Sequence, residues 1–223
     1  MLREENVAAV KTLFEEKHIP EDYEEARSHL RCKLISDKVY ERELADLNVL
    51  HEKELGLTLI PIYDSGTGYS HAIPVEAARI WERAKDEIVQ AALTETEKAY
   101  PPQMQALNDL LLIPIKDEGL YVLSAGKTLT KYEANDEEWY PFGAIVMMMS
   151  QALQMAANKL QADFYILPSL WTEVYLLPIR RNESDTLNKL HLLMHNIIAQ
   201  TPSRAILTRN IYVYHRGMGL TLL

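Results

Sequence analysis

The sequence predicts an α+β, or mixed α/β, fold in which a partly antiparallel sheet is covered by amphipathic helices. Residues 29–36 alternate polar and apolar side chains, which is the period of a strand with one covered face. Residues 163–168 and 173–179 are two apolar runs separated by a short polar break, which favours an antiparallel pair of strands. Residues 184–199 place apolar side chains three or four positions apart, as an amphipathic helix does.

The remaining elements are expected from the same two periods. Helices are predicted over residues 4–17, from residue 21 onward, over 37–46, from Pro74 at the first helical position toward residue 100 with a break near residue 84, and over 103–111. Strands are predicted over residues 57–62, 69–73, 119–125, 210–216 and 219–223, the first two forming a hairpin with glycines at 66 and 68 in its turn. The continuously apolar run 142–149 has strand length, so it is expected to begin a strand–helix–strand crossover that ends at the strand starting at residue 163.

Composition indicates one globular domain over residues 1–223, because 48% of the residues are hydrophobic and no Gly/Ser/Pro-rich linker divides the chain. The formal net charge is −9, and the first 25 residues hold eight acidic and three basic side chains. Residues 1–28 are therefore expected to form an acidic helical segment that either packs on the domain or projects from it. The negative charge disfavours direct binding to nucleic acid.

Two further features indicate a cytoplasmic protein. No window of the sequence approaches the roughly 20 apolar residues of a membrane span, and no signal-peptide pattern begins the chain. The single cysteine, Cys32, lies in an alternating strand pattern, where a buried reduced thiol is expected rather than a nucleophile.

Candidate catalytic residues lie at the polar break and in the last helix. Ser169 and Glu173 lie four residues apart, but the Gly-x-Ser-x-Gly pattern of a nucleophilic serine is absent. His191 and His195 lie on one helical face with zinc-ligand spacing, yet the glutamate of the H-E-x-x-H pattern is missing between them. We therefore predict no catalytic, cofactor or metal site, and for both histidines a structural role is favoured over a functional one.

Candidate binding residues are exposed aromatic and acidic side chains. Trp171 is expected to be partly exposed at the polar break, and aromatic side chains are enriched in binding hot spots. The predicted partner-binding residues are Trp171, Glu173, Glu15, Glu16, Glu21 and Asp22. An acidic surface of this kind imitates phosphate, so the expected partner is a protein, such as a basic nucleic-acid-binding protein.

Several stretches of the chain resemble an uncharacterised family, a domain of unknown function of gut Firmicutes, chiefly clostridial and lachnospiraceal, and of their mobile elements and phages. The resemblance covers residues 24–223 and is most specific at "DFYILPS" with "EV" and "LP" behind it. Members of that family usually have a second serine and then a histidine before the glutamate, where this chain has Leu170 and Thr172. The resemblance implies a bacterial accessory protein of mobile DNA and no established activity.

Two hypotheses from different classes follow. The first is a non-enzymatic protein-binding module of a mobile element or phage, such as an anti-CRISPR-like anti-defence inhibitor that acts through acidic contacts. The second is a small hydrolase or ligand-binding enzyme whose pocket uses His191, His195 or Glu173. Direct DNA binding is a third, weaker hypothesis, which rests on five arginines near the C-terminus: Arg180, Arg181, Arg204, Arg209 and Arg216.

Overall fold

A computed structural model shows two compact units, residues 1–99 and 100–223. The structure describes residues 11–12, 14–44, 48–66, 70–107, 119–126, 142–168, 170–180, 186–199 and 206–223. Every strand pair among these residues is antiparallel, so the predicted α+β class with an antiparallel sheet is confirmed. That residues 1–223 form one domain stays a prediction.

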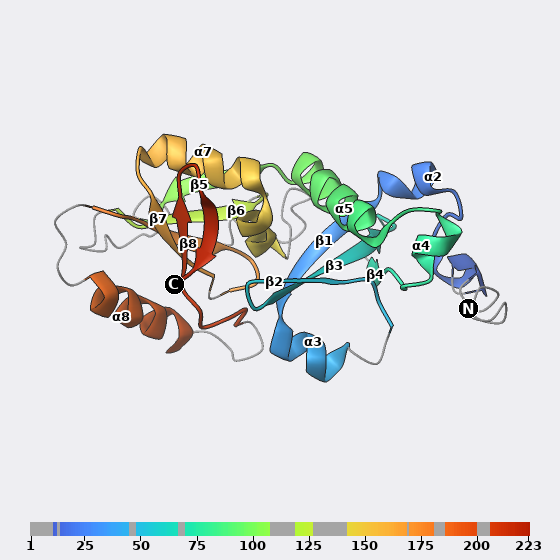
Figure 1. Ribbon diagram of the computed structural model, residues 1–223, viewed down its shortest axis with the longest axis horizontal. Helices are drawn as coiled ribbons and strands as arrows, with labels where there is room; N and C mark the ends of the chain where they lie inside the picture. The colour runs from blue at the N-terminus through green and yellow to red at the C-terminus, as the bar shows by residue number, and fades with distance from the viewer. Residues whose placement is uncertain are drawn as a thin grey trace. The chain divides into compact units, whose positions relative to one another are not determined.

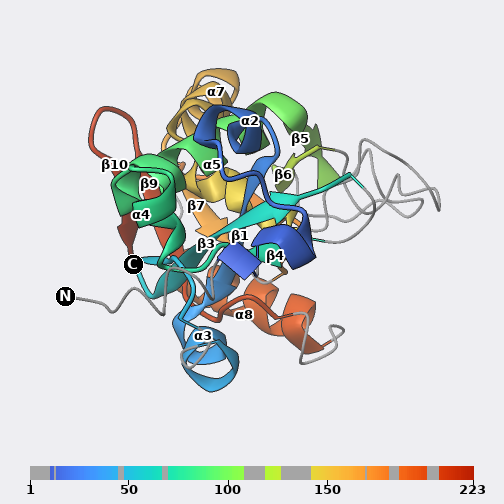
Figure 2. The same ribbon diagram turned by 90° about the vertical axis from the view of Figure 1, so that its right-hand side faces the viewer.

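Unit 1 is a four-stranded sheet with helices on both sides (Figures 1 and 2). Its elements are α2 (Tyr23–Arg27), β1 (Leu30–Ser36), α3 (Asp37–Glu43), β2 (Glu52–Glu54), β3 (Leu57–Asp64), β4 (Ser70–Ala72), α4 (Ala77–Ile80) and α5 (Lys85–Ala99). The buried strand β3 pairs with β1, β2 and β4, the last pair forming the predicted hairpin. In β1, Cys32 is fully buried, as predicted, and its backbone N–H donates to the Thr96 hydroxyl of α5 at 2.8 Å.

Unit 2 is a six-stranded antiparallel sheet with the order β10-β9-β7-β8-β6-β5, and α7 and α8 lie on opposite faces of it (Figures 1 and 2). Its elements are β5 (Pro102–Ala106), β6 (Tyr121–Ala125), the 3₁₀ helix η3 (Gly143–Met148), α7 (Ser150–Leu160), β7 (Phe164–Leu167), β8 (Val174–Pro178), α8 (Thr186–Ala199), β9 (Tyr212–His215) and β10 (Gly219–Leu222). The core on the α8 face includes Leu167, Leu177, Leu190 and Met194. The predicted antiparallel return after the polar break is confirmed by the β7–β8 pair.

The prediction of a strand over residues 142–149, and with it the crossover, is wrong. This run forms the 3₁₀ helix η3 and is almost entirely buried. A continuous apolar run shows only that all sides are covered, which both a strand and a helix can satisfy. Glycine is needed at position 143, where η3 begins, because a Cβ there would lie 2.2 Å from the Thr172 carbonyl oxygen.

Two other boundaries differ from expectation. Residues 103–106 belong to strand β5, because pairing with β6 satisfies their backbone groups, and Pro102 is tolerated at the start of this edge strand. Pro74 forms an isolated bridge with Val49, so it is not the first helical residue, and α4 begins at Ala77. The predicted break near residue 84 is real, since α5 begins at Lys85. Within the described ranges, no helix has the length and apolarity that crossing a membrane requires.

Candidate protein-binding surface

The acidic segment ends its first helix with a specific capping motif. Residues 14–17 are helical, and His18 takes a left-handed backbone conformation (φ 53°). The Ile19 N–H donates to the Phe14 carbonyl at 2.8 Å, and the His18 N–H donates to the Glu15 carbonyl at 3.2 Å. These two bonds define a Schellman motif, whose apolar contact joins Phe14 and Ile19. The helix therefore ends where the His-Ile-Pro sequence predicts, and the chain turns sharply toward α2.

An aromatic cluster fixes this turn to unit 1. Phe14 and Tyr23 pack against Trp81 with ring centroids 5.5 and 5.7 Å apart, and all three side chains are buried. The Trp81 indole N–H donates to the Pro20 carbonyl at 3.0 Å. The described part of the acidic segment thus packs against Trp81 and is fixed there by aromatic contacts and by one hydrogen bond to its backbone.

Above this cluster lies the acidic hollow, a shallow depression of about 400 Å³. It is lined by Phe14, Glu15, His18, Ile19, Pro20, Glu21 and Glu25. Glu21 makes an ion pair with Lys11 at 2.5 Å, whereas neither Glu15 nor Glu25 has a basic partner among the described residues. The hollow therefore combines a partly apolar base with three carboxylates, two of which have no basic partner in the part of the chain that the structure describes.

The other predicted acidic residues have different surroundings. Asp22 caps α2, since its Oδ1 accepts a hydrogen bond from the Glu25 N–H at 2.9 Å. Glu16 is exposed but does not line the acidic hollow. Glu25 does line it and was missed by sequence reasoning, although its position four residues after Glu21 and at the start of a predicted helix was a usable signal.

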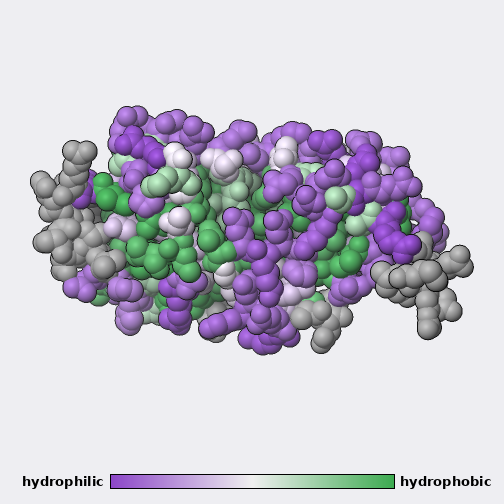
Figure 3. All heavy atoms as spheres, in the orientation of Figure 1, coloured by the Kyte–Doolittle hydropathy of each residue, from purple (hydrophilic) through white to green (hydrophobic). Residues whose placement is uncertain are grey.

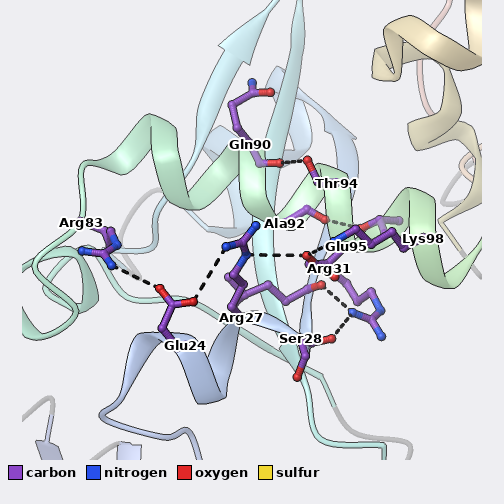
Figure 4. A network of polar contacts seen from close by, with 12 residues as sticks. Glu24, Arg27, Ser28, Arg31, Arg83, Gln90, Ala92, Thr94, Glu95 and Lys98 are labelled. Carbon is purple, nitrogen blue, oxygen red and sulfur yellow. Dashed lines mark hydrogen bonds and ion pairs between the residues drawn. The ribbon is translucent and has the colours of Figure 1, made fainter.

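A second depression on unit 1, the balanced hollow, has about the same size, 410 Å³, but paired charges. Among its lining residues, Glu24 lies between Arg83 and Arg27, at 3.3 and 3.9 Å (Figure 4). The Arg83 guanidinium lies over the Tyr23 ring, 4.9 Å from its centroid. Glu87 accepts a hydrogen bond from the Ala84 N–H at 3.1 Å.

Beside the balanced hollow, Glu95 continues this network. Its Oε1 lies 3.7 Å from the Arg27 Nε and 2.7 Å from the Lys98 Nζ, and its side chain is only 12% exposed (Figure 4). The carboxylates around the balanced hollow thus have partners within the protein.

The polar break of unit 2 joins β7 to β8. Trp171 is 39% exposed, as predicted, and its ring meets Phe142 edge to face at 6.5 Å. Glu173 is only 4% exposed and accepts a hydrogen bond from the Tyr175 hydroxyl at 3.2 Å. Burial, and then the neighbouring Glu173 charge, raise the pKa of Tyr175. Trp171 is therefore accessible at the surface, whereas Glu173 is not. Ser169 lies outside the described residues.

Among the described residues, neither His191 nor His195 makes a contact with Glu173. His191 and His195 are exposed on α8, while Leu190 and Met194 of the same helix face the core. In the described ranges, no three His, Cys, Asp or Glu side chains gather closely enough to hold a metal ion. Of the arginines considered for DNA binding, Arg181 and Arg204 lie outside the described residues, and Arg216 contacts Asp163 at 3.5 Å.

Comparison with known proteins gives a family but no function. A family model described as a family of unknown function, DUF5688, matches residues 5–216. No curated protein and no solved structure matches the chain. The function must therefore be argued from the surfaces of this chain.

Proposed function

The chain belongs to DUF5688, a family of unknown function, and we propose that it is a non-enzymatic protein-binding module whose acidic hollow receives a basic side chain of a partner protein. One observation carries this proposal. Glu15, Glu21 and Glu25 line a hollow with a partly apolar base, and two of these three carboxylates have no basic partner among the described residues.

The chemistry of the hollow favours an arginine or a lysine. Such a side chain has an aliphatic stem that can pack on Ile19 and Pro20, and a cationic head that can pair with carboxylates. The carboxylates do not form a group that could hold a metal ion. A guanidinium, which is broad and has several donors, suits separated carboxylates better than a small ion does.

Preorganisation supports a binding role. The Schellman motif, the Asp22 cap and the Trp81 cluster fix the backbone on either side of the hollow. A partner would consequently meet carboxylates carried on a backbone that is already ordered, so less backbone entropy is lost on association. The net charge of −9 would also speed the approach of a basic protein and make it sensitive to salt.

A finer proposal concerns the partner. A basic nucleic-acid-binding protein has the required surface, and the chain would act as an accessory protein of a bacterial mobile element or phage that blocks it, in the manner of an anti-defence inhibitor. Support comes from the negative charge and from the family resemblance described above. Trp171, half-exposed on unit 2, is the proposed aromatic contact of this module.

The alternative of a hydrolase or ligand-binding enzyme gains no support from a specific observation. It would use His191, His195 or Glu173, whereas both histidines are exposed on α8 and Glu173 is buried with Tyr175 as a partner.

Affinity capture from bacterial lysate with quantitative mass spectrometry tests the proposal. The bait is the full chain, as wild type and as E15Q/E21Q/E25Q, at low and at physiological salt. The control is E24Q/E87Q, which neutralises both carboxylates that line the balanced hollow; E15Q/E25Q removes the same number of charges from the acidic hollow and is compared with it directly. We expect a basic protein to be retained by wild type and control, more strongly at low salt, and lost by the triple variant. No partner at either salt, or equal capture by the triple variant, would contradict the proposal.

A further inference from the structure

The strand β10 forms one edge of the six-stranded sheet of unit 2. It pairs with β9 on one side, and among the described residues no strand pairs with its other side. No residue of β10 is charged, and the apolar side chains of this hairpin are unusually exposed: Met218 at 78% and Leu222 at 48%. Natural edge strands commonly carry charges that prevent pairing. This edge lacks that protection.

The exposed leucines continue an apolar layer of the sheet. Leu222 lies opposite Tyr212 of β9, which in turn lies opposite Ile166 of β7. Ile166 and Tyr212 are fully buried, whereas Leu222 is half exposed. Figure 3 shows hydrophobic residues gathered on this face of unit 2, over the strands between α7 and α8. The layer therefore reaches the edge of the sheet without being covered there.

The hydrogen-bond pattern shows which backbone groups face outward. The Leu223 N–H donates to the Ile211 carbonyl on the β9 side. In an antiparallel strand, the backbone N–H and C=O groups of successive residues point alternately toward the two neighbouring strands. The backbone groups of Gly219 and Thr221 therefore also face β9, and those of Leu220 and Leu222 face the open edge. The open edge thus presents two N–H and two C=O groups, one of each from Leu220 and one of each from Leu222.

We propose that β10 pairs antiparallel with β10 of a second copy of this chain, about a two-fold axis at Thr221. In that register Leu220 lies opposite Leu222 of the other copy, and the two outward donors and two outward acceptors of each strand are all used. Leu220 and Leu222 of both copies then lie on one face, which extends the apolar layer across the interface.

The symmetry of β10 favours a second copy over another protein, because Leu220 and Leu222 flank Thr221 and the strand is complementary to itself about that residue. Each copy carries a net charge of −9, which opposes the association, but β10 is uncharged and adds no repulsion at the contact itself. Arg216, in the turn before β10, is already paired with Asp163 at 3.5 Å. Screening of the repulsion should make this dimer stronger as salt rises. Capture of a basic partner at the acidic hollow should weaken with salt, so the two associations are distinguishable.

Sedimentation equilibrium of the full chain over a range of concentrations tests the proposal. We expect a reversible monomer–dimer equilibrium that shifts toward dimer with salt. L222K should raise the dimer dissociation constant by at least about tenfold, because a lysine on an edge strand opposes pairing. The control L192K makes the same change at a leucine of α8 that is 62% exposed, and it should leave the dimer unchanged.

A cysteine at the axis tests the register. In the proposed pair Thr221 meets its own copy at a non-hydrogen-bonded position, the closer of the two antiparallel spacings, which suits a disulfide. T221C should therefore form a covalent dimer under mild oxidation faster than M218C, although Met218 is more exposed; the buried Cys32 does not compete. A monomer at all concentrations, a dimer insensitive to L222K, or faster cross-linking of M218C would overturn the proposal.

Discussion

The acidic hollow and the balanced hollow of unit 1 are alike in size but differ in how their carboxylates are used. In the balanced hollow Glu24 pairs with two arginines, and Glu87 caps the start of α5. In the acidic hollow Glu15 and Glu25 have no such partner among the described residues. Paired carboxylates therefore stabilise the folded state, whereas carboxylates without a partner lower the free energy of unfolding slightly and are available to a ligand. Measurements of stability and of binding can test this division.

The largest stability effect is expected at Glu95. E95A removes the carboxylate that pairs with Lys98 and with the buried Arg27 Nε, which has no hydrogen-bond partner among the described residues and is balanced by Glu95 through charge alone. We expect a loss of about 1–2 kcal/mol in the free energy of unfolding, measured by urea denaturation. E95Q, which keeps the shape and one acceptor, should lose less. Capture of the basic partner should be unaffected by either variant. A loss of capture would show that a paired carboxylate also takes part in binding, contrary to this account.

Asp22 separates a structural from a binding role within the acidic segment. D22A removes the cap of α2 and should cost about 1 kcal/mol in the free energy of unfolding. D22N and D22S retain an acceptor and should restore most of this stability. If Asp22 contacts the partner as predicted from sequence, D22N will weaken capture although stability is kept; if it is a cap alone, D22N will capture like wild type.

Asp163 of unit 2 is a paired carboxylate whose effect should depend on pH. Hydrogen bonds from the His215 ring and from the Arg216 N–H, at 3.0 and 3.1 Å, lower the pKa of Asp163. A lowered pKa in the folded state contributes stability above the unfolded-state value of about 3.9, and this stability is lost as the pH falls through the folded-state value. D163N should therefore be less stable than wild type at pH 7, by at most about 1 kcal/mol because the site is one-third exposed. The difference should shrink as the pH falls below about 3.9, which denaturation measurements at a series of acid pH values would show.

The smallest effect on stability is expected for the unpaired carboxylates themselves. E15Q/E25Q removes two charges that lack basic partners among the described residues, in a protein of net charge −9, so stability should stay within about 0.5 kcal/mol of wild type or rise. The same variant should lose affinity for the captured partner, which calorimetry would measure. A marked loss of stability in denaturation experiments would mean that these carboxylates hold the fold together.

Sequence reasoning succeeded where the hydrophobic period is unambiguous. The alternation at Leu30, Cys32 and Leu34 predicts β1, and the spacing of Ala152, Leu153 and Ala156 predicts the buried face of α7. It failed over residues 142–149, because a run that is buried on all sides has no period. It also failed over 103–106, because pairing with β6 decides the backbone conformation there, and that pairing is not visible in the local pattern.

The acidic hollow was only partly predictable. Charge and the His-Ile-Pro stop indicate exposed carboxylates at a helix end, and Glu15 and Glu21 follow from them. Which carboxylates remain unpaired depends on contacts between residues distant in sequence, such as Glu24 with Arg83, which lie 59 positions apart. The role of Trp81 as the support beneath the hollow depends likewise on the tertiary packing of Phe14 and Tyr23.

The most direct test of the central claim is a heteronuclear NMR titration of the full chain with a hexa-arginine peptide at low salt. The account predicts that amide shifts concentrate at Phe14, His18, Ile19 and Glu25, and that they disappear in E15Q/E21Q/E25Q but persist in E24Q/E87Q. Shifts concentrated at Arg27, Gln90 and Thr94 of the balanced hollow, or an unchanged response in the triple variant, would contradict it.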